Sequence, residues 1–263
     1  MTYAGFLAGF VGVPLAILAM LTLRDRAQGK RLPKALSGFS PVLAIGLHVL
    51  VAVLYTTPWD NYLVATRVWY YDPARVIGVV LGWVPVEEYT FFVVQTLFVG
   101  LWLIFLAHRL NIPVTRSARR FLPLPLFACA VVWLAAVAML ARNWRPGAYL
   151  GLELAWFLPP VMLQLAYGAS ILWHYRCLIL ATALPAWLYL SISDGLAIAA
   201  GVWTVNPIAA TGIHFFALPL EEFVFFGLTT TLIVFGLTLL LAQETWDSWP
   251  FTSHAISQRR VGL

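Results

Sequence analysis

The chain has 263 residues, of which 62% are hydrophobic and only 10% are charged. Soluble globular proteins carry roughly 25% charged residues, so the composition excludes an ordinary soluble domain, and the amount of apolar surface excludes disorder. The net charge of +5 does not indicate a nucleic-acid partner, because basic loops also orient membrane proteins. We therefore expect an all-α, polytopic membrane protein with about seven transmembrane helices.

Seven apolar segments are long enough to cross a bilayer, since one span needs about 20 residues. In chain order they cover approximately residues 3–23, 38–57, 78–107, 121–141, 149–172, 177–200 and 212–242. The third and seventh segments are too long for one straight helix, and each contains a proline, Pro85 or Pro219. Because proline either kinks or starts a helix, we expect a short lead-in element before each main helix.

Lysine and arginine residues are distributed unevenly between the two sides of the predicted bundle. The richer side has Arg24, Arg26, Lys30, Arg31, Lys34, Arg109, Arg116, Arg119, Arg120, Arg176, Arg259 and Arg260. The other side has Arg67, Arg75, Arg142 and Arg145. The positive-inside rule makes the richer side cytoplasmic. We expect a protein integral to the cell membrane, with its N-terminus outside and its C-terminus cytoplasmic.

Two regions of the chain align without a gap when the sequence is shifted by 134 residues. Matched pairs include Asp60 with Asp194, Trp69 with Trp203, Gly78 with Gly212, Pro85-Val86-Glu87-Glu88 with Pro219-Leu220-Glu221-Glu222, and Phe91-Phe92 with Phe225-Phe226. This match predicts a first repeat in residues 1–110, a linker with span four in 111–145, a second repeat in 146–242 and a loose cytoplasmic tail in 243–263. A single linking span makes the repeats parallel, related by an axis along the membrane normal.

Acidic residues inside the apolar segments are the strongest functional signal. They are Glu87, Glu88, Glu153, Asp194, Glu221 and Glu222, and Asp60 lies at the end of span two. An intramembrane carboxyl group is costly and by default marks a functional site. Without a cation partner, burial favours the neutral acid, which can donate a proton, whereas a helix N-terminus favours the charged form. We expect one acid to be protonated and another ionised, within one polar cluster built by both repeats.

Several residues near these acids fit both a functional and a structural role. Phe91, Phe92, Phe225 and Phe226 each lie one helical turn beyond a motif glutamate; their ring faces suit a cationic intermediate, although aromatic residues at this spacing commonly serve packing. Asp60, Asp194 and Glu153 are equally suited to hydrogen bonding at helix ends and to catalysis. We expect His48 and His214 to be core residues, Trp69 and Trp203 to be interfacial anchors, and Arg67 and Arg142 to reach the edge of the acid cluster.

Other classes of membrane protein lack support in the sequence. The only lysines, Lys30 and Lys34, lie in a basic loop, so no lysine in the last span can bind retinal. No glycine-rich phosphate loop, histidine pair for a metal or aspartate-rich motif is present. Two functions are left open by the sequence. One is acid–base chemistry on an apolar substrate, and the other is proton coupling in a transporter.

The motifs resemble those of the membrane-integral, cofactor-free lycopene β-cyclases, in the form in which the two halves of a heterodimeric enzyme are fused. The resemblance rests on Pro58-Trp59-Asp60-Asn61-Tyr62, Pro85-Val86-Glu87-Glu88-Tyr89-Thr90-Phe91-Phe92 and Leu218-Pro219-Leu220-Glu221-Glu222-Phe223-Val224-Phe225-Phe226. It implies cyclisation of the linear ends of lycopene to β-ionone rings, through γ-carotene to β-carotene, with Glu87, Glu88, Glu221 and Glu222 essential. Phe91, Phe92, Phe225, Phe226 and Tyr89 would then surround the substrate.

The implied reaction is an isomerisation that transfers no electrons overall, so no cofactor or metal is expected. Lycopene would enter from the lipid bilayer, and other enzymes of carotenoid synthesis are left open as partners. The parallel repeats predict that both glutamate pairs converge on one site and that the two ends of the substrate react in turn. A carotenoid hydratase acting on the same cation and a proton-coupled transporter are the alternatives. The sequence leaves open which glutamate is the acid and whether one or both ends react.

Overall fold

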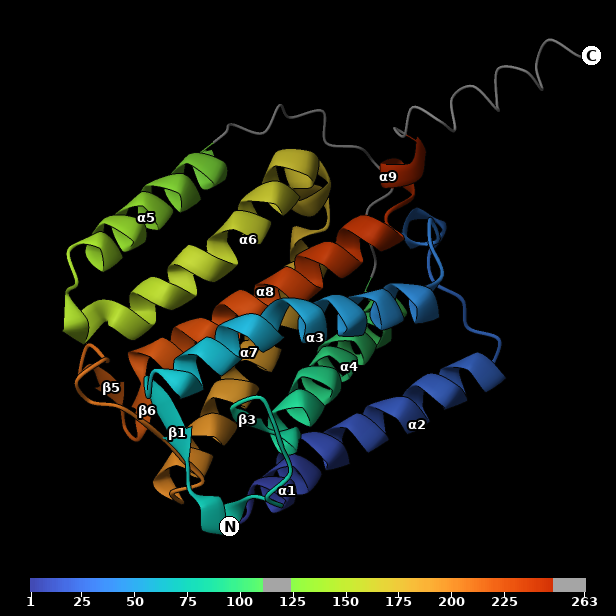
Figure 1. Ribbon diagram of the computed structural model, residues 1–263. Coiled ribbons are helices and arrows are strands. Elements are labelled where there is room, and N and C mark those ends of the chain that lie inside the picture. Colours follow the sequence, from blue (N-terminus) through green and yellow to red (C-terminus); the bar gives the residue numbers. More distant parts are fainter. Residues whose placement is uncertain (111–123, 248–263) are drawn as a thin grey trace, which may run out of the picture.

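The computed structural model describes residues 1–110 and 124–247. Within these residues, seven helices are long and apolar enough to cross a membrane, which confirms the prediction of an all-α, polytopic membrane protein. The helices lie side by side in one bundle (Figure 1). Arg116, Arg119, Arg120, Arg259 and Arg260, the first residues of predicted span four and most of the predicted tail lie outside the described residues.

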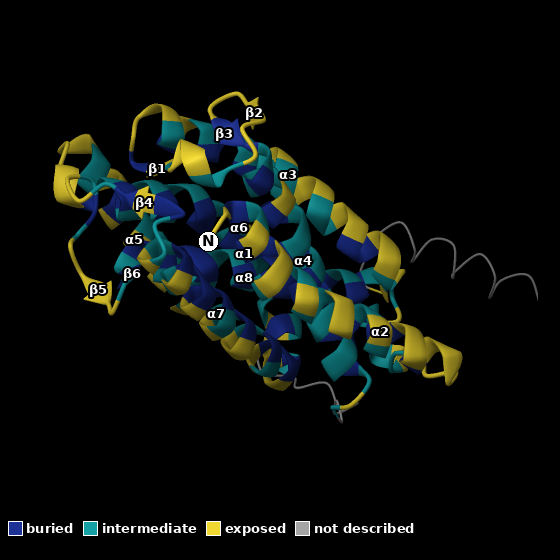
Figure 2. Ribbon diagram, turned by 90° about the horizontal axis from the view of Figure 1, so that it is seen from below, coloured by how far each residue is buried: buried dark blue, intermediate teal, exposed yellow. Residues whose placement is uncertain are grey.

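The first span combines α1 (Tyr3–Phe6), a π-helical segment η1 (Leu7–Gly12) and α2 (Val13–Ala27). The other spans are α3 (Pro41–Ala65), α4 (Val86–Ala107), α5 (Leu124–Ala141), α6 (Ala148–His174), α7 (Arg176–Ala199) and α8 (Leu220–Leu241). Helices α4 and α8 are the most deeply buried spans. The outer faces of α2, α3 and α7 are largely exposed (Figure 2), as expected where apolar side chains meet lipid.

A short β-hairpin precedes each of the two central helices. Strands β2 (Val80–Leu81) and β3 (Val84–Pro85) lead into α4, and strands β5 (His214–Phe215) and β6 (Leu218–Pro219) lead into α8. Pro85 and Pro219 occupy the N-cap positions, where their missing N–H groups cost nothing. The predicted lead-in elements are therefore confirmed. His214 lies exposed in β5, so the expectation that it belongs to the core is wrong.

Contacts between residues that are 134 positions apart relate the two halves of the bundle. Strand β1 (Trp69–Tyr71) pairs antiparallel with β4 (Trp203–Val205), and Tyr70 lies opposite Thr204. Similarly, the Gln95 side-chain amide on α4 donates to the Thr229 hydroxyl on α8 over 3.0 Å. A residue that contacts its own counterpart lies near a local two-fold axis. Such an axis therefore passes between α4 and α8.

Two prolines inside the spans lack the backbone N–H that would donate to the carbonyl group one helical turn earlier. In each case, a tyrosine hydroxyl from the opposite half donates to that carbonyl group instead. Pro14 cannot donate to the carbonyl of Phe10, and Pro160 cannot donate to that of Trp156. The Tyr189 hydroxyl donates to the Phe10 carbonyl over 2.6 Å, and the Tyr55 hydroxyl donates to the Trp156 carbonyl over 2.7 Å. Because no water in the bilayer core can take this role, the two hydrogen bonds join α7 to the first span and α3 to α6.

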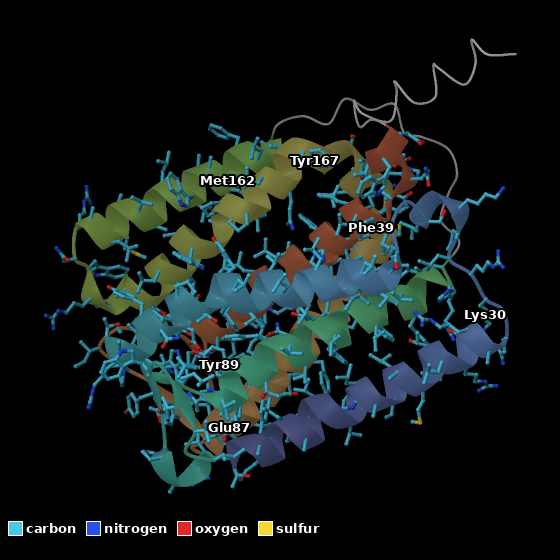
Figure 3. The ribbon with its side chains drawn as sticks, turned by 45° about the vertical axis from the view of Figure 1, so that its right-hand side comes forward. Lys30, Phe39, Glu87, Tyr89, Met162 and Tyr167 are labelled. Atoms are coloured by element: carbon cyan, nitrogen blue, oxygen red, sulfur yellow. The ribbon has the colours of Figure 1, made fainter. Side chains whose placement is uncertain are left out.

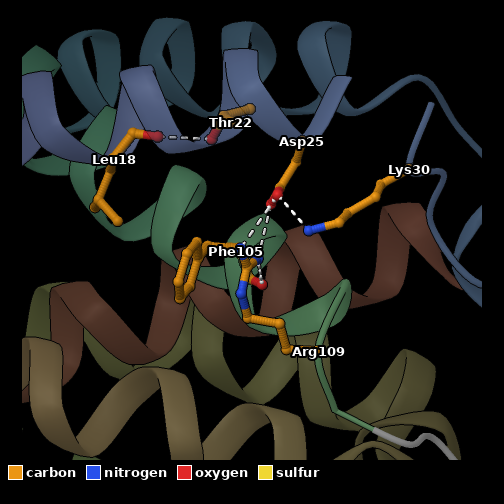
Figure 4. A network of polar contacts seen from close by, with 6 residues as sticks. All are labelled: Leu18, Thr22, Asp25, Lys30, Phe105 and Arg109. Atoms are coloured by element: carbon orange, nitrogen blue, oxygen red, sulfur yellow. Dashed lines mark hydrogen bonds and ion pairs between the residues drawn. The ribbon is translucent and has the colours of Figure 1, made fainter. Parts of the chain in front are cut away.

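The opposite end of the bundle from the hairpins is held together by a buried ion-pair network. Asp25, at the end of α2, accepts from Lys30 over 2.7 Å and from Arg109 over 2.8 Å (Figure 4). Arg109 also lies over the ring of Phe105. The paired charges fix the loop after α2 to the end of α4, so these basic residues have a structural role besides their effect on topology.

The start of the predicted loose tail is ordered instead. Residues Gln243–Asp247 form helix α9, and the Trp246 ring stacks on that of Phe39 at 5.4 Å between centroids. The indole N–H of Trp246 also donates to the carbonyl of Leu240. A single aromatic residue in a polar segment therefore anchors the end of the last span.

Candidate active site

A cavity of about 40 Å³ lies at the end of the bundle where α4 and α8 begin. Its lining consists of four acids, Asp60, Glu88, Asp194 and Glu222, and ten aromatic residues, Tyr3, Phe6, Trp59, Trp69, Phe91, Phe92, Tyr149, Trp203, Phe225 and Phe226. One buried water needs only about 10–15 Å³ of such space, so the cavity can hold a few water molecules. Acids and aromatic rings thus line one small space between the helices.

Both halves of the bundle supply the acids in equivalent pairs. Glu88 and Glu222 lie in the first turns of α4 and α8, while Asp60 and Asp194 lie near the ends of α3 and α7. The two Pro-x-Glu-Glu motifs therefore reach one cavity from the same end of the bundle. Within residues 1–110 and 124–247, no lysine, arginine or histidine lines the cavity, and Arg67 and Arg142 are not part of its wall.

Two tyrosines that the sequence analysis did not identify hold the cavity glutamates. The Tyr3 hydroxyl donates to Glu88, and the Tyr149 hydroxyl donates to Glu222 over 2.8 Å. The tyrosines begin the first and fifth spans, and they are related by an offset of 146 residues, as are Gly5 with Gly151 and Pro14 with Pro160. A repeat search that allowed one gap would have found them.

The two tryptophans expected at the membrane interface lie in the cavity wall instead. Trp69 and Trp203 are only 7% and 8% exposed. The indole N–H of Trp69 donates to Asp60 over 3.0 Å, and Asp194 has the equivalent partner in Trp203. The anchor prediction is wrong because a buried indole needs an acceptor, and each aspartate supplies one.

The first glutamate of each motif points away from the cavity. Glu87 accepts a hydrogen bond from the backbone N–H of Ile77, and Glu221 accepts one from that of Thr211, each over 2.6 Å. The residue after each donor is a glycine at positive φ, Gly78 at 91° and Gly212 at 75°, where a side chain would be strained. Glu87 and Glu221 therefore hold the turns that precede the two hairpins.

Tyr89 also contacts a hairpin and does not line the cavity. Its hydroxyl donates to the carbonyl of Leu81 over 2.8 Å and accepts from the Asn61 side chain over 2.9 Å. Figure 3 shows Glu87 and Tyr89 at the hairpin end of the bundle, with Lys30 at the opposite end. Tyr89 thus connects the loop before α4 to α3.

Glu153 on α6 is an acid without an equivalent in the other half. With the offset of 146 residues, its counterpart is Leu7. Its side chain is fully buried among Tyr149, Glu221 and Glu222, and neither oxygen makes a well-formed hydrogen bond to a described residue. It lies behind the cavity lining, on the side of Glu222.

Several aromatic rings of the cavity pack against one another. Trp59 and Phe225 stack with centroids 5.7 Å apart, and Phe91 meets Phe226 edge to face at 5.9 Å. Such ring faces attract a cation, and the acids beside them can exchange protons. Among the described residues, no three His, Cys, Asp or Glu side chains are arranged to hold a metal ion. Fold and cavity together define a membrane-spanning helical bundle whose buried acids and aromatic rings are suited to proton transfer.

Comparison with known proteins identifies the family. The family model for lycopene cyclases matches residues 1–106 and 146–241. The chain is 37% identical to the lycopene beta-cyclase of Halobacterium salinarum, over 90% of this chain and 95% of that protein. It is also 33% identical to the bifunctional lycopene cyclase/phytoene synthase of Podospora anserina, over 75% of this chain and 35% of that longer protein. The chain therefore belongs to the lycopene cyclase family. No solved structure matches it.

Proposed function

We propose that this protein is a lycopene β-cyclase, an isomerase that closes the linear ends of lycopene to β-ionone rings. The observation that carries this proposal is the lining of the cavity, in which every residue is either an acid or an aromatic. Acids can give and take a proton, and aromatic faces can stabilise the carbocation that forms between these two steps. Family membership supports the same reaction.

Glu88 and Glu222 are the proposed catalytic residues. The protonated member of the pair donates its proton to the terminal double bond of lycopene, which leaves a tertiary cation. The neighbouring double bond attacks this cation, and the new carbon–carbon bond closes a six-membered ring. The ionised member then removes a proton from the ring, which sets the ring double bond. One proton enters and one leaves, so the product is an isomer of the substrate and no redox cofactor is consumed.

The remaining acids have supporting roles in this proposal. Tyr3 and Tyr149 orient the two catalytic carboxyl groups, and Asp60 and Asp194 complete the polar part of the wall. Glu87 and Glu221 hold the turns that position α4 and α8. The aromatic rings that form most of the cavity wall keep bulk water from the cation, which water would otherwise capture.

The placement of the site in the membrane follows from the distribution of basic residues. We propose that the hairpin end faces outward and that the end with Asp25, Lys30 and Arg109 faces the cytoplasm of the cell. The catalytic cavity would then lie in the outer half of the membrane. Lycopene has no polar group, so the bilayer is its source and β-carotene returns there; other carotenoid-synthesising enzymes that share this membrane are candidate partners.

Expression in cells that accumulate lycopene tests the proposed function. Chromatography should show γ-carotene and β-carotene, both with the mass of lycopene. A hydratase would instead give products heavier by one water molecule per reacted end, and a transporter would leave the pigments unchanged. Either of these outcomes, with the protein present in the membrane, would contradict the proposal.

A further inference from the structure

A second cavity, of about 230 Å³, lies between α3, α4, α6 and α8. Phe92 and Phe225 line both this cavity and the acid cavity, so the two spaces meet at these rings. The rest of the wall is mostly apolar, with Phe157 and Leu232 among its residues. From Phe225 to Ile233 the cavity follows α8 for roughly 12 Å, at 1.5 Å of helix rise per residue.

The second cavity opens on an outer face of the bundle that is made of apolar side chains. Leu47 and Val51 belong to its wall and are 44% and 53% exposed, on a helix whose outer face meets the bilayer. At Tyr55, which also lines the pocket, α3 is joined to α6 by the hydrogen bond to the Trp156 carbonyl and by contact between the two rings, whose centroids are 5.0 Å apart. We infer that the entrance of this pocket lies between α3 and α6, and its inner end is at Phe92 and Phe225, beside the acid cavity.

The corresponding place in the other half of the bundle is filled. The repeat counterpart of Leu232 is Phe98, and that of Tyr55 is Tyr189. The rings of Phe98 and Tyr189 pack with their centroids 5.7 Å apart, and Phe98 is only 8% exposed. The two positions are equivalent in the repeat. The smaller leucine leaves a pocket open at one of them, whereas the larger phenylalanine fills the space at the other.

We propose that the second cavity binds one arm of the acyclic polyene and delivers its end past Phe92 and Phe225 to Glu88 and Glu222. This inference rests on the proposed function. It adds the path by which the polyene reaches the acids, and it assigns the polyene a single binding pocket. An extended carotenoid is about as long as the roughly 30 Å hydrocarbon core, so a pocket of roughly 12 Å holds only part of it. The second end reacts after the monocyclic product has left the pocket and entered again in reverse.

A matched pair of substitutions tests the route. Leu232→Phe fills the pocket, and Phe98→Leu makes the reverse change at the counterpart position. In membranes supplied with lycopene, Leu232→Phe should lower kcat/KM for cyclisation at least tenfold, mainly through a higher KM. Phe98→Leu should change it less than about threefold. Equal losses in both variants, or wild-type kinetics in Leu232→Phe at a normal membrane level, would overturn the proposal.

A second pair avoids any effect of overpacking on folding. Val51→Phe narrows the lipid-facing entrance, whereas Leu50→Phe enlarges a neighbouring side chain that is 55% exposed and lies outside the pocket wall. Val51→Phe should raise KM at least threefold, and Leu50→Phe should match the wild type. Equal KM values for the two variants would contradict entry between α3 and α6. Absence of cyclic products from the wild-type protein would instead refute the proposed function itself.

Discussion

At the scale of single residues, the adjacent glutamates of each motif have different surroundings. Neighbouring helical positions point about 100° apart, so one carboxyl group of each pair faces the cavity while the other accepts a backbone N–H. The resemblance to a family implied the same essential role for all four glutamates. The structure instead separates the two members of each motif: Glu88 and Glu222 line the cavity, whereas Glu87 and Glu221 accept backbone hydrogen bonds in turns.

Glutamine substitutions separate these roles. Glutamine keeps the shape of glutamate but cannot donate and recover a proton, so Glu88→Gln and Glu222→Gln should each lower the cyclisation rate at least about 100-fold. Glu87→Gln and Glu221→Gln keep an oxygen that accepts the backbone N–H, and should lose less than about tenfold. Initial rates in isolated membranes, normalised to protein amount, measure the difference. The division would be refuted if the Glu87 and Glu221 variants were the inactive pair.

Much of the cavity could be predicted from the sequence, because rare acids in apolar segments point to function wherever they fold. Asp60, Glu88, Asp194, Glu222 and the four phenylalanines all line the cavity. The tyrosines escaped notice because a tyrosine at the start of an apolar segment resembles an interfacial residue. The orientation of the Glu87 side chain could not be predicted either, because its hydrogen-bond partner is a backbone N–H in a loop.

At the scale of elements, two prolines in the spans are each matched by a hydroxyl group from another helix. Pro14 leaves the Phe10 carbonyl free, and Tyr189 donates to it; Pro160 and Tyr55 form the corresponding pair through Trp156. The sequence predicted the ends of most spans within about four residues, since hydrophobic length decides them; α3, however, continues to Ala65, well past the predicted end at residue 57. The sequence could not predict these interhelical hydrogen bonds, which require the three-dimensional arrangement.

The proline–tyrosine pairing can be tested by a double-mutant cycle. Tyr189→Phe should destabilise the protein by about 1 kcal/mol, because the Phe10 carbonyl loses its donor. In a Pro14→Ala background the loss should be smaller, since alanine at this position restores a backbone N–H to the helix. Unfolding in mixed detergent micelles measures both values. An identical cost in the two backgrounds would show that the hydroxyl group and the proline are independent.

At the scale of the whole molecule, a local two-fold relation brings both halves to one site. The two halves nevertheless supply different side chains around that site. The acids and tyrosines of the cavity occur in pairs, as do Trp69 and Trp203. In contrast, Trp59 has Ser193 as its counterpart, Glu153 has Leu7, and the pocket beside Leu232 is filled by Phe98 at the equivalent place. A symmetric scaffold therefore supports an asymmetric site. This suits a reaction that needs a proton donor and a proton acceptor in different states.

The orientation of the molecule gives a prediction that is independent of activity. With Cys129 and Cys177 replaced by serine, the variant Trp83→Cys, in the exposed hairpin, should react with a membrane-impermeant thiol reagent on intact cells. The variant Arg26→Cys should react only after the membrane is opened. Labelling in the reverse pattern would place the N-terminus in the cytoplasm and the catalytic cavity in the inner half of the membrane.

The most direct test of the central claim follows the proton itself. Isolated membranes in D₂O, supplied with unlabelled lycopene, should yield γ-carotene with one deuterium and β-carotene with two, because each ring closure takes one hydron from a carboxyl group that exchanges with solvent. Products that contain no deuterium would show that no solvent-derived hydron enters the ring, and would contradict cyclisation through Glu88 and Glu222.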